Sequence, residues 1–314
     1  MTKGMRTLCV TIAAFTLLGV VTGCGSGPSR ANAAAVIGDT TIPVSDIQQR
    51  LDAVLKKEPG ADKLSQQRRL DDVSRQLVTL AVRHELIQQA AKRENLSVDE
   101  KQINDLIDQV GGAEKASKGT VYTPERFHER TSDQLLTVAL GTKYLSRLSV
   151  TFDFTFAAQR DEALAKAKEM ASGPDGVKRV IERDKARNLE AQFGVTHTAK
   201  DNPKLATLAM FGAPQGSVVA FQLGQDGEAA ETGFMIAHIV KREVAPATGQ
   251  QAPSDQQDSR AMESFGLRML AFQATESTLE LSPRYGEWDE IELSALGANN
   301  PSSGVLYRQG GSAA

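Results

Sequence analysis

The spacing of apolar residues predicts a mostly helical chain. Its clearest helix has apolar positions at alternating steps of three and four residues, a spacing kept over about three heptads. These positions are Leu70, Val73, Leu77, Leu80, His84, Ile87 and Ala91. A helix with such a seam must pack along other helices. His84 interrupts the seam, and a histidine on an apolar stripe is more often a hydrogen-bonded core residue than a ligand or catalyst.

Capping signals predict further helices. Residues 97–100 (Ser-Val-Asp-Glu) have the spacing of a capping box and predict a helix over 98–110, which Gly111-Gly112 ends. Residues 123–125 (Thr-Pro-Glu) predict a helix that runs to Leu148. Earlier in the chain, a short strand over 35–42 with a Gly-Asp turn leads into a helix from Ser45.

At Leu148 the pattern becomes mixed. Residues 151–156 (Thr-Phe-Asp-Phe-Thr-Phe) alternate with a period of two and predict a strand. Helical sequence follows, and residues 217–221 and 233–240 then predict two more strands. We therefore expect a small α+β module of about 95 residues, inserted into the helical sequence. His197 falls in a predicted loop of this module.

Residues 245–258 have the composition of a linker, and a last helix follows them. Its apolar residues Met262, Phe265, Met269 and Phe272 again recur at steps of three and four, so this helix must pack against earlier ones. From Gly297 onward the chain consists mainly of small and polar residues, which predicts a disordered tail.

Composition and charge remove several function classes. The chain has 36 basic and 39 acidic residues, and its basic residues are scattered, so nucleic acid is not expected as a partner. Cys9 and Cys24 are its two cysteines, and both precede the predicted folded part. No disulfide framework, zinc site or thiol nucleophile is therefore expected there, and no metal or other cofactor is predicted.

The N-terminus has the pattern of an export signal. Lys3 and Arg6 precede an apolar run over 8–21 that is too short for a comfortable permanent membrane span. Residues 21–24 (Val-Thr-Gly-Cys) resemble a bacterial lipobox, which implies cleavage before Cys24 and a diacyl lipid on that cysteine. The protein would then be anchored in the bacterial cell membrane, facing the extracytoplasmic side. Cleavage after residues 31–33 (Ala-Asn-Ala) is the alternative, and it would discard Cys24.

Together these patterns predict a mainly α fold, a discontinuous helical bundle interrupted by a small α+β insert. The predicted parts are a signal peptide (1–23), a tether (24–34), a helical domain (35–149), the insert (150–245), a linker (246–257), a helix and strand that return to the helical domain (258–293) and a disordered tail (294–314).

This order of elements resembles the SurA/PrsA family of exported chaperones. Residues 36–39 (Val-Ile-Gly-Asp) stand where the family often has an Asn-Gly turn, and residues 282–286 (Ser-Pro-Arg-Tyr-Gly) match its exit from the last helix. The resemblance implies that the insert is a parvulin-type peptidyl-prolyl isomerase domain. It also implies that the last helix folds back onto the N-terminal bundle.

The insert departs from the parvulin pattern. Its opening strand lacks the family's histidine, and Met235 stands in the histidine position of the closing strand. His238 lies three residues later, on the opposite sheet face. A Gly-Gly-Asp-Leu-Gly segment is absent, and residues 192–195 (Gln-Phe-Gly-Val) are its nearest match. No catalytic residue is therefore assigned, and a degenerate, inefficient isomerase domain is expected.

The resemblance implies a chaperone or holdase that binds unfolded exported polypeptides in an apolar groove. Methionine suits such binding because it is flexible and polarizable. The candidate peptide-binding residues are Phe211, Phe221, Met262, Phe265, Met269 and Phe272. The same helical spacing is more often that of a core stripe. An active isomerase with an unusual site and a lipoprotein dedicated to one envelope partner are the alternative functions.

Overall fold

The structure, a computed structural model, describes residues 32–57, 69–223, 233–246, 259–297 and 302–308. Cys24, the predicted signal peptide and residues 247–257 of the predicted linker lie outside these ranges. In the part of the chain that the structure describes, no helix has the length and apolar character needed to cross a membrane.

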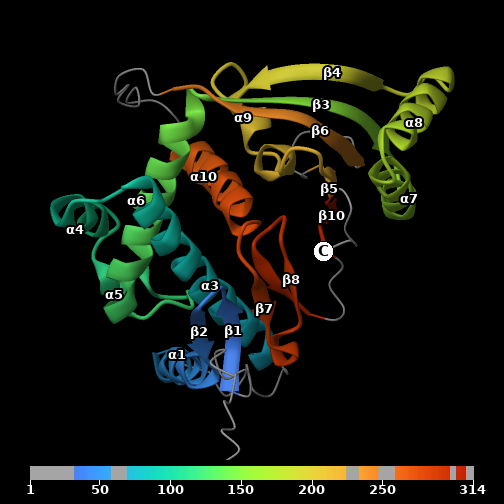
Figure 1. Ribbon diagram of the computed structural model, residues 1–314. Helices are drawn as coiled ribbons and strands as arrows, with labels where there is room; N and C mark the ends of the chain where they lie inside the picture. Colours follow the sequence, from blue (N-terminus) through green and yellow to red (C-terminus); the bar gives the residue numbers. More distant parts are fainter. Residues whose placement is uncertain (1–31, 58–68, 224–232, 247–258, 298–301, 309–314) are drawn as a thin grey trace, which may run out of the picture.

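Four helices form the core of the bundle: α1 (Val44–Lys57), α3 (Leu70–Glu94), α6 (Pro124–Leu145) and α10 (Ser259–Ala274). Figure 1 shows α10 beside α6, although the whole insert separates them in the sequence. Two shorter helices, α4 (Glu100–Gln109) and α5 (Ala113–Ala116), pack against α6. The bundle is thus built from both ends of the chain.

The crossing of α6 and α10 depends on two glycines. A Cβ atom at Gly266 of α10 would lie 2.0 Å from the carbonyl oxygen of Thr137, and one at Gly141 of α6 would lie 2.4 Å from that of Met262. Both distances are far below van der Waals contact. The two helix backbones therefore touch at this point, and only glycine leaves room for them.

The insert contributes four strands to a five-stranded antiparallel sheet in the order β10-β5-β6-β3-β4, and β10 comes from the end of the chain. Its strands are β3 (Leu148–Ala157), β4 (Ala191–Thr198), β5 (Val218–Gln222), β6 (Phe234–Val244) and β10 (Gly304–Tyr307). Two helices, α7 (Arg160–Ala171) and α8 (Pro174–Ala186), pack on its outer face (Figure 1). The inner face meets α9 (Pro203–Ala206), η2 (Ala209–Gly212) and, beyond them, α10.

Side chains along each strand point alternately to the two faces of the sheet, and each face packs into a different hydrophobic core. Phe152 and Met235 point inward, into one continuous core that runs from the bundle to the sheet. Ile236 and Ala220 point outward, into a smaller core with α7 and α8. The insert is therefore packed onto the bundle through its inner sheet face.

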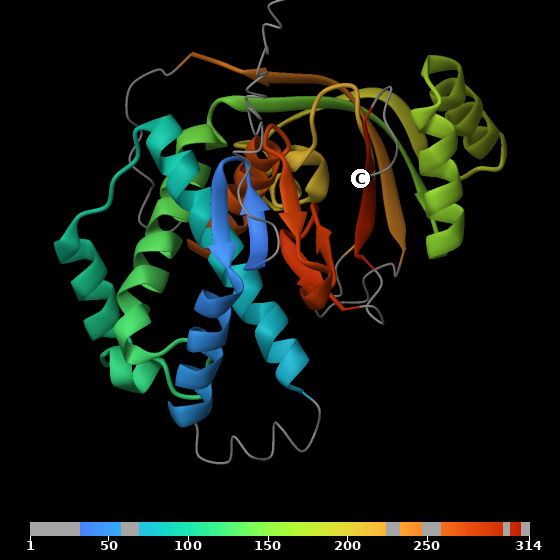
Figure 2. The ribbon, with the colours of Figure 1, turned by 60° about the horizontal axis from the view of Figure 1, so that its bottom comes forward.

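The structure also contains two smaller sheets, and the first joins a strand from the start of the described chain to one that follows α10. The first, in the order β2-β1-β7, contains β1 (Ala33–Ile37), β2 (Thr40–Pro43) and β7 (Leu279–Leu281). The second pairs β8 (Glu287–Asp289) with β9 (Ser294–Leu296), after the short η3 (Pro283–Tyr285). Figure 2 shows these hairpins in front of the bundle.

The predicted mainly α fold with an α+β insert is confirmed, with local corrections. The first strand begins at Ala33, two residues inside the predicted tether, because Ala33 and Ala34 are buried. The capping box is formed by Asp99 and Gln102, not by Ser97 and Glu100. The predicted loop around His197 is β4, a strand that the sequence did not reveal.

The predicted disordered tail is wrong where the structure describes it. Residues 294–296 form β9, and residues 304–307 form β10, which pairs with β5. Leu306 is buried, and Gly304 lies so close to Ala220 that any Cβ would collide with the backbone. Although this segment has a polar composition, burial of alternate residues on a sheet edge stabilises it as a strand.

Candidate functional site

A cleft of about 160 Å³ opens between α1, α3 and α6. Leu77 and Leu80 of α3 and Ala53 of α1 supply apolar surface in it. Tyr122 belongs to the loop before α6, which forms one wall. The lining is completed by Asp46, Gln49, Arg50, Val121, Thr123, Arg126 and Glu129. The cleft thus combines an apolar interior with charged groups.

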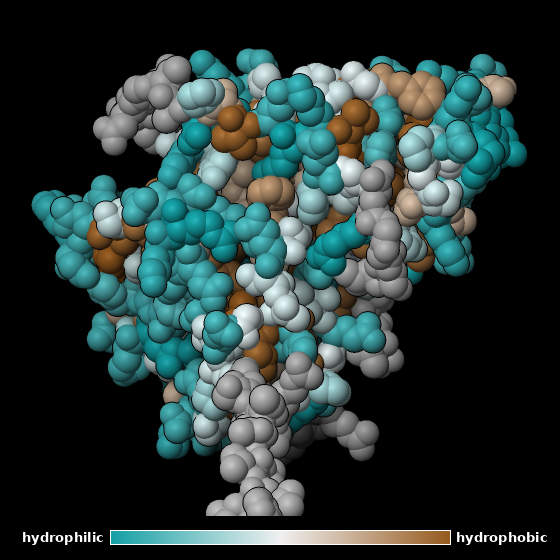
Figure 3. Space-filling model, viewed as in Figure 1, coloured by the Kyte–Doolittle hydropathy of each residue, from teal (hydrophilic) through white to brown (hydrophobic). Residues whose placement is uncertain are grey.

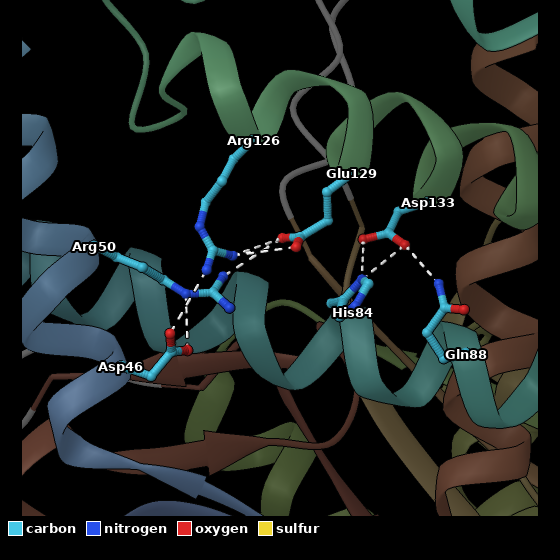
Figure 4. A network of polar contacts seen from close by, with 7 residues as sticks. All are labelled: Asp46, Arg50, His84, Gln88, Arg126, Glu129 and Asp133. Atoms are coloured by element: carbon cyan, nitrogen blue, oxygen red, sulfur yellow. Dashed lines mark hydrogen bonds and ion pairs between the residues drawn. The ribbon is translucent and has the colours of Figure 1, made fainter. Parts of the chain in front are cut away.

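The charged groups form a closed ring between α1 and α6 (Figure 4). Arg50 contacts Asp46, one turn before it in α1, at 2.9 Å and Glu129 of α6 at 3.6 Å. Arg126 contacts Glu129 at 3.0 Å and Asp46 at 3.6 Å. Each carboxylate is shared by two guanidinium groups, so the ring has no net charge. It joins α1 to α6 across one side of the cleft.

A second polar group lies beside the ring and joins α3 to α6. His84 Nδ1 lies 2.9 and 2.8 Å from the two carboxylate oxygens of Asp133, and Gln88 donates to the same carboxylate at 3.1 Å. The hydrogen bond from His84 to Asp133 raises the pKa of the imidazole above its ordinary value. The expectation that His84 is a hydrogen-bonded residue of the seam is confirmed.

The wall of the cleft is held by one lysine. Lys57, at the end of α1, donates from its ammonium group to the carbonyl oxygens of Ser117, Thr120 and Tyr122, each at 2.7 Å. An ammonium group has three protons, so it can satisfy all three carbonyls at once. The loop is thereby fixed to α1, and Tyr122 is held at the cleft.

The cleft has the properties of a binding site for part of a polypeptide. Its volume suits one apolar side chain, and the ring beside it offers hydrogen-bond donors and acceptors to a bound backbone. Among the residues that the structure describes, no group of three or more histidines, cysteines or carboxylates is placed to hold a metal ion.

The predicted peptide-binding residues lie elsewhere, and their placement corrects the predicted groove. Five of the six are buried in the core: Phe211, Phe221, Met262, Phe265 and Met269. The rings of Phe211 and Phe265 pack edge to face, with centroids 6.3 Å apart. Phe272 is partly buried, and the Arg242 guanidinium lies 3.9 Å from its ring centroid. These residues join the insert to α10 inside the core, and none of them lines the cleft.

The surface agrees with this correction. On the face shown in Figure 3, hydrophobic residues form separate groups among hydrophilic ones, not one broad patch.

The inner face of the sheet, where the resemblance places an isomerase site, is closed. Met235 is only 6 % exposed and lies between Phe156 and Phe221 on the neighbouring strands. His238 points to the outer face, where its Nδ1 lies 2.9 Å from Asp153. His197 stacks on Phe152, with centroids 5.8 Å apart. The histidines of the insert therefore do not meet at Met235.

The cleft itself was not predicted. Its one local signal is the spacing of Asp46 and Arg50, four residues apart on one face of a helix. The partners of this pair, Arg126 and Glu129, come from a different helix. Their meeting depends on how α1 and α6 cross, which residue spacing does not specify.

Comparisons with known proteins support one family. Residues 3–140 match the family model of the SurA-like N-terminal domain, and every residue of the cleft lies within this stretch. No curated protein matches the sequence.

Solved structures also match the chain, and two of them are foldase proteins. The foldase protein PrsA from Lactococcus lactis is 16 % identical, with 78 % of this chain and 88 % of that chain covered and a TM-score of 0.24. The foldase protein PrsA from Streptococcus pneumoniae is 12 % identical, with 78 % and 94 % covered and a TM-score of 0.22. The family model confirms the predicted resemblance over residues 3–140: the chain carries a SurA-like N-terminal domain.

Proposed function

We propose that this protein is a membrane-anchored, extracytoplasmic chaperone that holds unfolded segments of exported proteins without efficient proline isomerisation. The observation that carries the proposal is the contrast between two surfaces. The SurA-like domain has an open cleft with apolar lining, whereas the Met235 face of the insert is packed against the rest of the core.

The closed face supports the absence of isomerisation. An enzyme for this reaction must admit an X-Pro segment and lower a rotational barrier of about 18–20 kcal/mol. Met235 and Phe211 are buried, and α10 packs on η2, the element that contains Phe211. A substrate could reach Met235 or Phe211 only by displacing the residues that pack on them.

Anchoring rests on the sequence alone. The lipobox-like residues 21–24 support lipidation of Cys24, which lies outside the described residues. A diacyl group would hold the protein stably at the membrane, where exported chains emerge unfolded. Cys24→Ala should then move the protein from the membrane fraction to the soluble fraction, and an unchanged distribution would refute the anchor.

Two assays test the activity. We expect suppression of the aggregation of a chemically unfolded protein, and little or no acceleration in a protease-coupled proline-isomerisation assay. Ala53→Phe, which fills the cleft, should weaken suppression several-fold. Gln48→Phe adds the same ring at an exposed position of α1 outside the cleft and should have little effect.

Each contrary result has a distinct meaning. Robust isomerisation would establish an active enzyme, despite the closed face. Failure to suppress aggregation would favour a lipoprotein dedicated to one envelope partner. Equal suppression by the Ala53→Phe and Gln48→Phe variants would remove the cleft from the client-binding surface.

A further inference from the structure

The five-stranded sheet has two edges, and they differ. One edge is β10, a strand from the end of the chain that pairs with β5 through four residue pairs. The other is β4, the uppermost strand in Figure 1. Within the described ranges, no strand pairs with the outer side of β4. The backbone groups on the outer side of β4 therefore determine what could bind at this edge.

The hydrogen-bond pattern shows which groups of β4 point outward. The amide of Ala199 donates to the carbonyl oxygen of Leu148 at 2.9 Å, so these two residues form a hydrogen-bonded pair. Such pairs alternate with non-hydrogen-bonded ones in an antiparallel ladder. Thr196, opposite Thr151, and Thr198 are therefore in non-hydrogen-bonded positions.

One side-chain contact agrees with this assignment. The hydroxyl oxygens of Thr151 and Thr196 lie only 2.7 Å apart, as expected for the more closely spaced kind of pair. The amide and carbonyl of Thr196 and the amide of Thr198 therefore point away from β3. The carbonyl of Thr198 accepts a hydrogen bond from the Asn202 amide at 3.3 Å. The amide and carbonyl of Thr196 and the amide of Thr198 therefore remain as outward backbone groups that an added strand could hydrogen-bond.

A bulge limits the length of this edge. The register between β3 and β4 shifts around Asp153, and Gly194 has a φ of +63°. The Gly194 amide donates to the Asp153 carboxylate at 2.8 Å and so is already occupied. The regular edge thus comprises residues 195–198.

The regular edge is short and ends at a bulge, two features that limit strand pairing, but it carries no blocking residue. Natural edges are commonly blocked by proline, lysine or inward charges. Residues 195–198 are Val-Thr-His-Thr and contain neither proline nor lysine. Three of the four are β-branched, which favours extended structure. Thr196 is exposed, and its neighbours Val195 and His197 are partly exposed.

We propose that the outer edge of β4, at residues 195–198, binds an extended, uncharged segment of an unfolded client polypeptide by strand addition. The proposal rests on the proposed chaperone function and names a contact that the cleft does not provide. Recognition through backbone groups does not depend on the client's sequence, which suits a protein with many clients. At the opposite edge of the sheet, β10 pairs with β5 in the antiparallel manner that the proposal expects for a client segment on β4.

Hydrogen exchange on the unaltered protein is the direct test. The probe is a synthetic peptide of alternating threonine and valine residues with a lysine at each end. Its binding should slow exchange of the Thr196 and Thr198 amides at least about tenfold, because both become hydrogen-bonded. A twin peptide that is N-methylated at every threonine and valine, so that neither of its edges can donate, should give no protection.

A variant provides the second measurement. Thr196→Pro removes an outward amide and leaves the inward amides of the ladder in place, so peptide affinity should fall about tenfold. Thr196→Val keeps the amide and should bind like the parent. If the proline variant misfolds, the exchange measurement on the parent decides.

The outcomes separate this proposal from the function on which it rests. Aggregation suppression without protection of Thr196 and Thr198 would overturn strand addition and leave the chaperone function intact. Protection that grows with protein concentration in the absence of peptide would also overturn it, because the occupant would be a second copy of the chain. Absence of any suppression or peptide binding would refute both.

Discussion

At the scale of single residues, the cleft is organised by groups that are only partly buried. The side chains of the ring Asp46–Arg50–Glu129–Arg126 are between 13 % and 35 % exposed. Ion pairs with this much solvent contribute little stability individually. Their closed arrangement instead fixes the position of α1 relative to α6. The ring is therefore best understood as defining the shape of the cleft.

His84 should make the stability of the bundle depend on pH. Its pKa is raised by the hydrogen bond to Asp133, above an ordinary value of about 6.5. A raised pKa in the folded state means that the stabilisation is fully present below the ordinary value and is lost as pH rises through the folded-state value. Urea unfolding of the wild type should thus show a fall in stability over this range that the His84→Gln variant lacks.

A second histidine serves as the control for this measurement. His128 contacts Glu100 at 2.8 Å but is 46 % exposed, so His128→Gln should preserve most of the pH dependence. Identical pH profiles for the wild type and the His84→Gln variant would show that the contact between α3 and α6 through Asp133 does not depend on protonation.

At the scale of elements, the long helices were predictable and the polar strands were not. The period of Leu77, Ile87 and their neighbours identifies α3 because one helix face is buried from Leu77 to Ala91. β4 contains Gln192, Thr196 and Thr198 and is exposed on its outer edge, so its sequence shows no apolar alternation. β10 follows a stretch of small and polar residues, and its pairing with β5 is a long-range contact. The sequence pattern within a strand does not indicate which distant strand it pairs with.

Gly266→Ala should destabilise the bundle at the crossing of α6 and α10. The added methyl would meet the Thr137 carbonyl at 2.0 Å, and backbone atoms cannot move aside as a flexible side chain can. Overpacking of this kind costs about 1–3 kcal/mol in the free energy of unfolding. Ser264→Ala, a partly exposed position in the same helix, is the matched control in chemical denaturation. Equal stability of the two variants would show that the helices can separate at little cost.

At the scale of the whole molecule, the last part of the chain ties the bundle to the sheet. After α10, β7 pairs with β1 near the start of the described chain, and β10 pairs with β5 of the insert. Asp289 links these parts. Its carboxylate accepts from the Ile291 amide at 2.8 Å, within its own turn, and from the Ser302 hydroxyl at 2.8 Å, just before β10. Arg83 of α3 donates to the Leu293 carbonyl at 2.8 Å and holds the same turn against the bundle.

Deletion of residues 302–314 should therefore destabilise the protein, whereas a disordered tail could be removed without effect. The deletion uncovers the β5 edge and the apolar surface that Leu306 covers, at a cost of about 2–4 kcal/mol. An uncovered strand edge also promotes self-association. We expect a lower melting temperature and a larger species in size-exclusion chromatography. Deletion of residues 309–314 alone keeps β10 and is the control. Unchanged melting and a monomeric elution of the longer deletion would show that β10 contributes neither stability nor protection of the sheet edge.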